Sequence, residues 1–174
     1  NDIEIAVEIG VWRGDSAIPI ALALKRTGGM LYAIDPWSNT IAAAEQSSRD
    51  RHWWSNADME QAFEDFRERK LFSGVSKHIT TLKYTSLDAL QIVRPQGKIG
   101  LLHIDGNHGQ WSSLADVVNY VPQVAQGGFV YFDDTDWHST KLAYELLQKT
   151  LSHVDMVGSG SNDKPNCAVF VKDW

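Results

Sequence analysis

The sequence contains almost no cysteine, and this scarcity excludes several kinds of protein. Cys167 is the only cysteine among 174 residues, so no disulfide can form within the chain. With a single thiol we expect neither a thiolate zinc site nor a redox pair of cysteines. This composition fits a reducing compartment, and we expect the protein to be cytoplasmic.

Basic residues and long apolar runs are also scarce. Sixteen Lys and Arg residues face 22 Asp and Glu residues, which gives a net charge of -6 and argues against a nucleic-acid partner. No apolar run approaches the roughly 20 residues of a membrane span, and no signal peptide is apparent, so we expect no membrane partner. The chain begins at Asn1 without a methionine, and we expect an upstream segment, with any substrate lid that it carries, to precede it.

The order of apolar runs predicts an α/β fold in one domain, residues 1–174. Strand-like runs alternate with stretches of helical period, the pattern of a parallel sheet covered by crossover helices. The chain is therefore expected to form a Rossmann-like, doubly wound and mostly parallel seven-stranded sheet that ends in an antiparallel hairpin. The predicted strands are Glu4–Ile9, Met30–Ile34, His78–Tyr84, Ile99–Ile104, Phe129–Phe132, Val154–Val157 and Ala168–Val171. The predicted helices are Ser16–Arg26, Ala57–Lys70, one from near Ser86, Trp111–Val124 and Trp137–Leu151.

Residues 37–55 interrupt this alternation. The segment is polar, contains Trp37, Trp53 and Trp54, and is long for a connection between a strand and a helix. We interpret it as a functional insertion that covers a substrate. His52 could belong to such a lid, although a solvated loop residue is the simpler interpretation.

A glycine turn followed by an acidic residue indicates a nucleoside ligand. Gly10 and Gly14 lie between the first strand and its helix, where the backbone can turn sharply and approach a ligand. Asp35 ends the second strand, where a carboxylate can bind both hydroxyls of a ribose. Pro36 and Trp37 follow and could pack against adenine, while a packing role in the core is an equal alternative for Trp37. The glycine turn alone is also compatible with a turn that binds nothing.

Three aspartates at the ends of two other strands predict a metal site. Asp105 follows the fourth strand, and Asp133 and Asp134 follow the fifth. The carboxyl ends of neighbouring parallel strands meet at one edge, so these carboxylates should converge and need a cation, and oxygen ligands suit Mg²⁺, Mn²⁺ or Ca²⁺. The alternative is that Asp134 caps the next helix and Asp133 faces water.

Three histidines are further candidates. His108 comes three residues after Asp105 and could act as a general base, although an ordinary loop histidine is equally compatible with this position. His103 shares the strand face of Asp105, which favours a supporting or core role. His138 could contact a substrate or begin a helix.

Together these motifs resemble class I S-adenosylmethionine (SAM)-dependent methyltransferases. Within that family they are similar to metal-dependent small-molecule and sugar O-methyltransferases of the cephalosporin-hydroxylase-like and macrolide-modifying type. The resemblance implies that SAM is contacted by four parts of the chain. They are the first strand with its glycine turn, the ribose-binding acid with its neighbours, the segment after the third strand, and the end of the fourth strand. These residues are Glu8, Gly10, Trp12, Gly14, Ser16, Asp35, Pro36, Trp37, Ser86 and Asp105.

The resemblance also implies the chemistry. Asp105, Asp133 and Asp134 would hold the metal, with Mg²⁺ expected, and Asp105 and His108 would be catalytic. The predicted function is metal-assisted O-methylation of a small-molecule acceptor, by a chain that could form a homo-oligomer. Two alternatives stay open: a metal-independent N- or C-methyltransferase, and a non-catalytic SAM-binding module of a larger protein.

Overall fold

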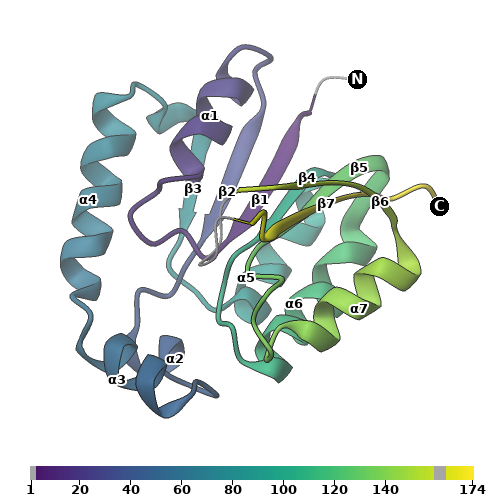
Figure 1. Cartoon of the computed structure of the whole chain (residues 1–174). Helices are drawn as coiled ribbons and strands as arrows, with labels where there is room; N and C mark the ends of the chain where they lie inside the picture. The colour runs from purple at the N-terminus through teal and green to yellow at the C-terminus, as the bar shows by residue number, and fades with distance from the viewer. Residues whose placement is uncertain (1–2, 159–163) are drawn as a thin grey trace.

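A computed structural model describes residues 3–158 and 164–174, and its centre is one seven-stranded sheet (Figure 1). The strand order is β3-β2-β1-β4-β5-β7-β6, and all neighbouring pairs from β3 to β5 are parallel. β7 runs antiparallel to both β5 and β6. The strands are β1 Ile5–Ile9, β2 Met30–Ile34, β3 Ile79–Leu82, β4 Ile99–Ile104, β5 Val124–Phe132, β6 Ser152–Val157 and β7 Cys167–Val171. The predicted sheet and its terminal hairpin are confirmed, and the hairpin turn includes residues 159–163, outside the described residues.

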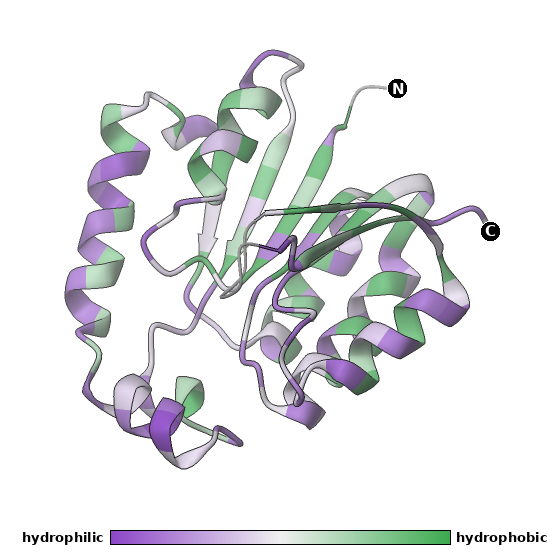
Figure 2. Cartoon of the chain, in the orientation of Figure 1, coloured by the Kyte–Doolittle hydropathy of each residue, from purple (hydrophilic) through white to green (hydrophobic). Residues whose placement is uncertain are grey.

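Helices cover both faces of the sheet. α1 and α4 pack on one face, while α5, α6 and α7 pack on the other (Figure 1). The alternation of β1 explains the two layers, since Ala6 faces the α1 core and Val7 the α6 core. Figure 2 shows apolar strands between helices whose polar residues lie on the outer faces. The helices are α1 Ala17–Lys25, α2 Asn39–Ala42, α3 Ser48–Asn56, α4 Met59–Phe72, α5 Ser86–Val93, α6 Gln110–Tyr120 and α7 Lys141–Thr150, with short 3₁₀ turns at Ser76–His78, Arg94–Gln96 and Val121–Gln123.

Several predicted boundaries differ from the structure: the helix predicted to end at Val124 ends at Tyr120, and the starts of β5 and α7 also differ. β5 begins at Val124 and runs through Gly127 and Gly128, which were predicted to precede it, because backbone hydrogen bonds with Lys172 extend the pairing. α7 begins at Lys141 and not at Trp137, because the preceding residues form turns tied back to the end of β5.

The tryptophan-rich insertion folds into two short helices, α2 and α3, beyond the carboxyl ends of the parallel strands (Figure 1). This is the edge at which the predicted site residues lie. Within residues 3–158 and 164–174, no helix is long and apolar enough to cross a membrane.

Candidate functional site

A cavity of about 580 Å³ opens at the carboxyl edge of the sheet. Its walls come from the turns after β1, β2, β3 and β4, from the insertion, and from one face of α6. Among the predicted site residues, those that line it are Gly10, Trp12, Ser16, Asp35, Pro36, Ser86, Asp105 and His108. The sequence prediction therefore located this cavity, although some predicted residues lie elsewhere.

Gly10 allows the turns after β1 and β4 to touch. Its φ is +87°, and a Cβ atom at this position would lie 1.8 Å from the backbone oxygen of Asp105. Only glycine fits such a contact. Gly14 has a different role, because a Cβ there would meet the Phe66 ring of α4 at 2.6 Å. Gly14 therefore permits close helix packing and does not line the cavity.

Asp35 fixes the shape of the glycine turn. Its Oδ2 accepts hydrogen bonds from the backbone N–H groups of Val11 and Trp12 at 3.0 and 2.9 Å, and its Oδ1 accepts one from Trp37 at 2.7 Å. Burial raises the pKa of the Asp35 carboxyl, and these three donors oppose the rise. A carboxylate accepts about four hydrogen bonds, so Asp35 can hold the turn and still bind a ribose hydroxyl.

Tryptophans form one wall of the cavity. Trp12 packs against Trp53 and Trp54 with ring centroids 5.8 and 5.6 Å apart. Trp37, predicted to contact adenine, does not line the cavity: its indole packs against Phe63 and Phe66 in the core, and its Nε1 donates to the Trp12 carbonyl. A φ of +43° at Trp37 turns the chain in this direction.

Ser86 pairs with an acid that the sequence analysis missed. The Ser86 hydroxyl donates to Oδ1 of Asp116 at 2.5 Å, and the hydroxyl of Tyr120 donates to the Ser86 carbonyl at 2.6 Å. Asp116 lines the cavity, is only 5% exposed, and burial raises its pKa to about 7. A signal was available in the sequence, because Asp116 precedes Tyr120 by four residues and so shares a helical face with this large aromatic side chain.

Asn107 ties the insertion to the turn after β4. Its amide nitrogen donates to the carbonyls of Ile41 and Ala44 at 2.7 and 3.1 Å, and its Oδ1 accepts from Gln46 at 2.9 Å. Glu45 of the insertion accepts hydrogen bonds from the first backbone N–H groups of α6. These contacts position the cavity wall that was predicted to cover a substrate.

Asp105, His108 and Asp134 converge at the cavity edge. One ligand atom from each lies within 4.8 Å of the others. Nε2 of His108 is 2.9 Å from Oδ2 of Asp134 and 3.6 Å from Oδ1 of Asp105. Neither ring nitrogen of His108 has an aligned hydrogen-bond partner among the described residues, so these contacts are charge pairs.

The two carboxylates determine the protonation of His108. Burial alone would lower its pKa, but Asp105 and Asp134 outweigh burial and raise the pKa to about 9. At neutral pH the ring is therefore cationic as long as no other cation is bound to the two carboxylates. The predicted role of a general base requires that another cation neutralise them.

Asp133 does not join this group. It belongs to a second cluster, with His103 and Cys167. Asp134 does not cap α7 either, because Thr140 occupies the N-cap position. The predicted metal site of Asp105, Asp133 and Asp134 therefore needs a correction: the structure brings His108 to the first and third of these carboxylates.

The other predicted residues lie away from the cavity. Glu8 is fully buried and accepts hydrogen bonds from the Ser16 hydroxyl and from Nδ1 of His103, the latter at 3.1 Å. His52 and His138 are exposed. For His52 this favours the solvated loop residue expected as the simpler interpretation, whereas His138 does not begin a helix, because α7 begins at Lys141.

The Asp105, His108 and Asp134 group fits a divalent cation. It offers two carboxylates and an imidazole whose buried nitrogens lack aligned partners. Within the described residues, neither carboxylate forms a salt bridge with lysine or arginine. Oxygen donors suit Mg²⁺ and Mn²⁺.

Comparisons with known proteins bear on the family and the fold of the chain. The model of a family described as a methyltransferase domain matches residues 7–135. No curated protein matches the chain.

Several solved structures are similar. The O-methyltransferase TomG from Streptomyces achromogenes, involved in tomaymycin synthesis and solved with SAM, is 17% identical, with a TM-score of 0.71 over 98% of this chain and 74% of that chain. An O-methyltransferase from Bacillus cereus in complex with SAH is 15% identical, with a TM-score of 0.71 over 98% and 75% of the two chains. The N-methyltransferase NodS from Bradyrhizobium japonicum is 17% identical, with a TM-score of 0.60 over 98% and 86%.

Proposed function

Because the chain belongs to the methyltransferase domain family, whose class I members use SAM, we propose that it methylates a hydroxyl group of a small molecule with the help of a divalent cation. The observation that carries this proposal is one cavity that joins the glycine turn and Asp35 to Asp105 and His108. A donor site and an acid-lined acceptor site therefore share a single space.

The proposed SAM site follows the first three strands of the sheet. Asp35 would bind the ribose, the turn at Gly10 would lie against the cofactor, and Ser86 would contact adenine. The ordered backbone of this turn, held by Asp35, supports the proposal because it needs no rearrangement to receive a ligand. The sulfonium of SAM supplies an electrophilic methyl group, so the protein has mainly to align donor and acceptor and to exclude water.

The proposed acceptor site lies at the end of β4. Asp105 and Asp134 would hold a divalent cation, Mg²⁺ or Mn²⁺, and such an ion lowers the pKa of a hydroxyl group bound to it. His108, 12% exposed at its side chain and adjacent to both carboxylates, would accept the hydroxyl proton. The Trp53 and Trp54 rings would cover the acceptor and exclude water.

A matched substrate panel tests the proposal. Purified protein is incubated with methyl-labelled SAM and pairs of small molecules that differ only in carrying a hydroxyl or an amine. We expect transfer to the hydroxyl compounds, its loss after chelation, and its recovery with Mg²⁺ or Mn²⁺. Transfer to amines that survives chelation would favour a metal-independent N-methyltransferase instead.

Two measurements identify the roles of the residues. His108→Gln is expected to lower methyl transfer by about 10²- to 10⁴-fold while calorimetric SAM affinity stays unchanged. Asp134→Asn should weaken Mn²⁺ binding and leave SAM affinity intact. A chain that binds SAM but transfers no methyl group under any of these conditions would support the non-catalytic alternative.

A further inference from the structure

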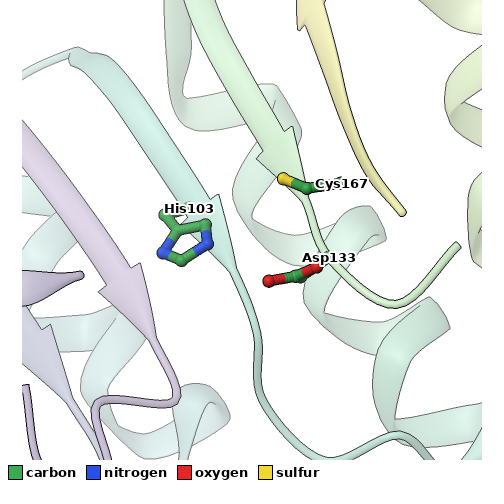
Figure 3. A group of neighbouring side chains, drawn as sticks. All are labelled: His103, Asp133 and Cys167. Atoms are coloured by element: carbon green, nitrogen blue, oxygen red, sulfur yellow. The ribbon is translucent and has the colours of Figure 1, made fainter. Parts of the chain in front are cut away.

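A second group of potential ligands lies beside the proposed active site. His103 of β4, Asp133 after β5 and Cys167 of β7 each offer one ligand atom, and these three atoms lie within 4.8 Å of one another. Figure 3 shows the three side chains directed toward a common point between the strand ends. His103 and Cys167 are buried, with exposed fractions of 8% and 7%.

The sheet register explains why these residues meet. β4 pairs with β5, so His103 lies beside Tyr131, and β5 pairs with β7, so Phe132 lies beside Ala168. One step further along this register places Asp133 opposite Cys167. All of them lie on the face of the sheet that α1 partly covers, because the alternate residues Leu102 and Phe132 belong to the core on the other face.

The histidine of this group is already oriented as metal-binding histidines are. Its Nδ1 lies 3.1 Å from the buried carboxylate of Glu8, and no described residue forms a hydrogen bond with its Nε2. A carboxylate at Nδ1 fixes the ring and the tautomer, and it strengthens the second nitrogen as a ligand. Glu8 in turn is held by the Ser16 hydroxyl.

The charge around the group also calls for a cation. Glu8, Asp105 and Asp133 all lie close enough to His103 to act on its charge, and among the described residues none of the three forms a salt bridge with lysine or arginine. A bound metal ion displaces the proton of a coordinating thiol to solvent.

We propose that His103, Asp133 and Cys167 form a binding site for zinc or a similar borderline-soft divalent ion, separate from the proposed magnesium site. Nitrogen, oxygen and sulfur together match the ligands of zinc, whereas Mg²⁺ avoids sulfur. Tetrahedral zinc needs ligand atoms about 3.3–3.6 Å apart, so the three side chains have to close by roughly an ångström. One cysteine is sufficient here, because the other two ligands come from histidine and aspartate.

A second cavity, of about 600 Å³, reaches the histidine of this group. It is lined by His103 and Tyr131 on the sheet and by Ile20 and Leu24 of α1. Asp133 and Cys167 do not line this cavity, so it bears only on the approach of an ion to His103.

Cobalt spectroscopy tests the proposal directly. Metal-free protein is titrated with Co²⁺ in the presence of excess Mg²⁺. The Mg²⁺ is expected to occupy the site of Asp105 and Asp134. We expect a thiolate-to-cobalt charge-transfer band that disappears in Cys167→Ala and persists in Asp105→Asn. Cobalt binding without this band, or a band that survives in Cys167→Ala, would overturn the proposal.

Zinc calorimetry supplies measurements that do not depend on the cysteine variant. Wild-type protein should release at least one proton for each Zn²⁺ bound, as shown by titration in buffers of different ionisation enthalpy. Glu8→Gln should weaken Zn²⁺ binding by about 10- to 100-fold, because it loosens His103. Zinc binding without proton release would rule out thiolate ligation even if Cys167→Ala failed to fold. These results do not depend on methyl transfer, so either proposal can fail without the other.

Discussion

Asp116 is expected to make the stability of the protein fall as pH rises from about 4 to about 7. Burial raises its pKa from 3.8 to about 7. The folded state then keeps a proton that the unfolded chain has already lost, so folding becomes less favourable with each step of pH through this range. Above about pH 7 the effect is complete and corresponds to about 4 kcal/mol.

Asp116→Asn isolates this contribution. Asparagine has the shape of the neutral acid and can still accept the hydrogen bond from the Ser86 hydroxyl, but it does not titrate. Between about pH 5 and pH 8, the unfolding free energy of the wild type should fall by about 3 kcal/mol more than that of the variant. Urea unfolding of both proteins at the two pH values measures the difference, and every other titrating group cancels.

Glu68→Gln is the matched control. This carboxyl group lies on an exposed face of α4, so the variant controls for the exchange of a carboxyl for an amide away from the cavity. Parallel pH profiles for the wild type and Asp116→Asn would refute the reasoning, because they would mean that Asp116 titrates in the folded protein as it does in the unfolded chain.

Three further changes test other contacts. Gly10→Ala should destabilise the fold by about 3 kcal/mol or more, because the added Cβ would meet the Asp105 carbonyl. Gly28 also has a positive φ, of +82°, but nothing lies within 4 Å of an added Cβ. Thermal unfolding of Gly28→Ala should therefore show a loss of only about 1 kcal/mol. Asn107→Ala should expose the insertion to limited proteolysis; Asn119→Ala, whose amide bonds only Ala115 of its own helix, should not. Asp35→Asn should weaken calorimetric SAM affinity by at least about tenfold, because an amide cannot accept three backbone N–H groups as a carboxylate does; unchanged affinity would exclude the proposed role of the turn.

The fold and the position of the cavity follow from local patterns. Buried strands with helical stretches between them predict a parallel sheet, and in such a sheet the ends of neighbouring strands converge. For this reason Gly10, Asp35 and Asp105 could be assigned to one cavity from their spacing alone.

The grouping of the aspartates depended on backbone geometry that spacing does not reveal. Consecutive strand residues point to opposite faces, so Asp133 and Asp134 diverge, and a φ of +52° at Asp134 turns its side chain toward His108. Asp133 stays on the face shared with His103 and Cys167. Similarly, Trp37 turns into the core, and Asp116 reaches the cavity from a helix whose face could be predicted but whose neighbours could not.

The contact between Gly10 and the Asp105 carbonyl also bears on how such a domain can change over evolution. No side chain fits at position 10. Substitutions there therefore cannot change the distance between the turns after β1 and β4. The helices α2 and α3, in contrast, are tied to the turn after β4 through side chains such as Asn107. Acceptor preference is therefore expected to diverge through residues 38–56, while the distance between donor and acceptor stays constant.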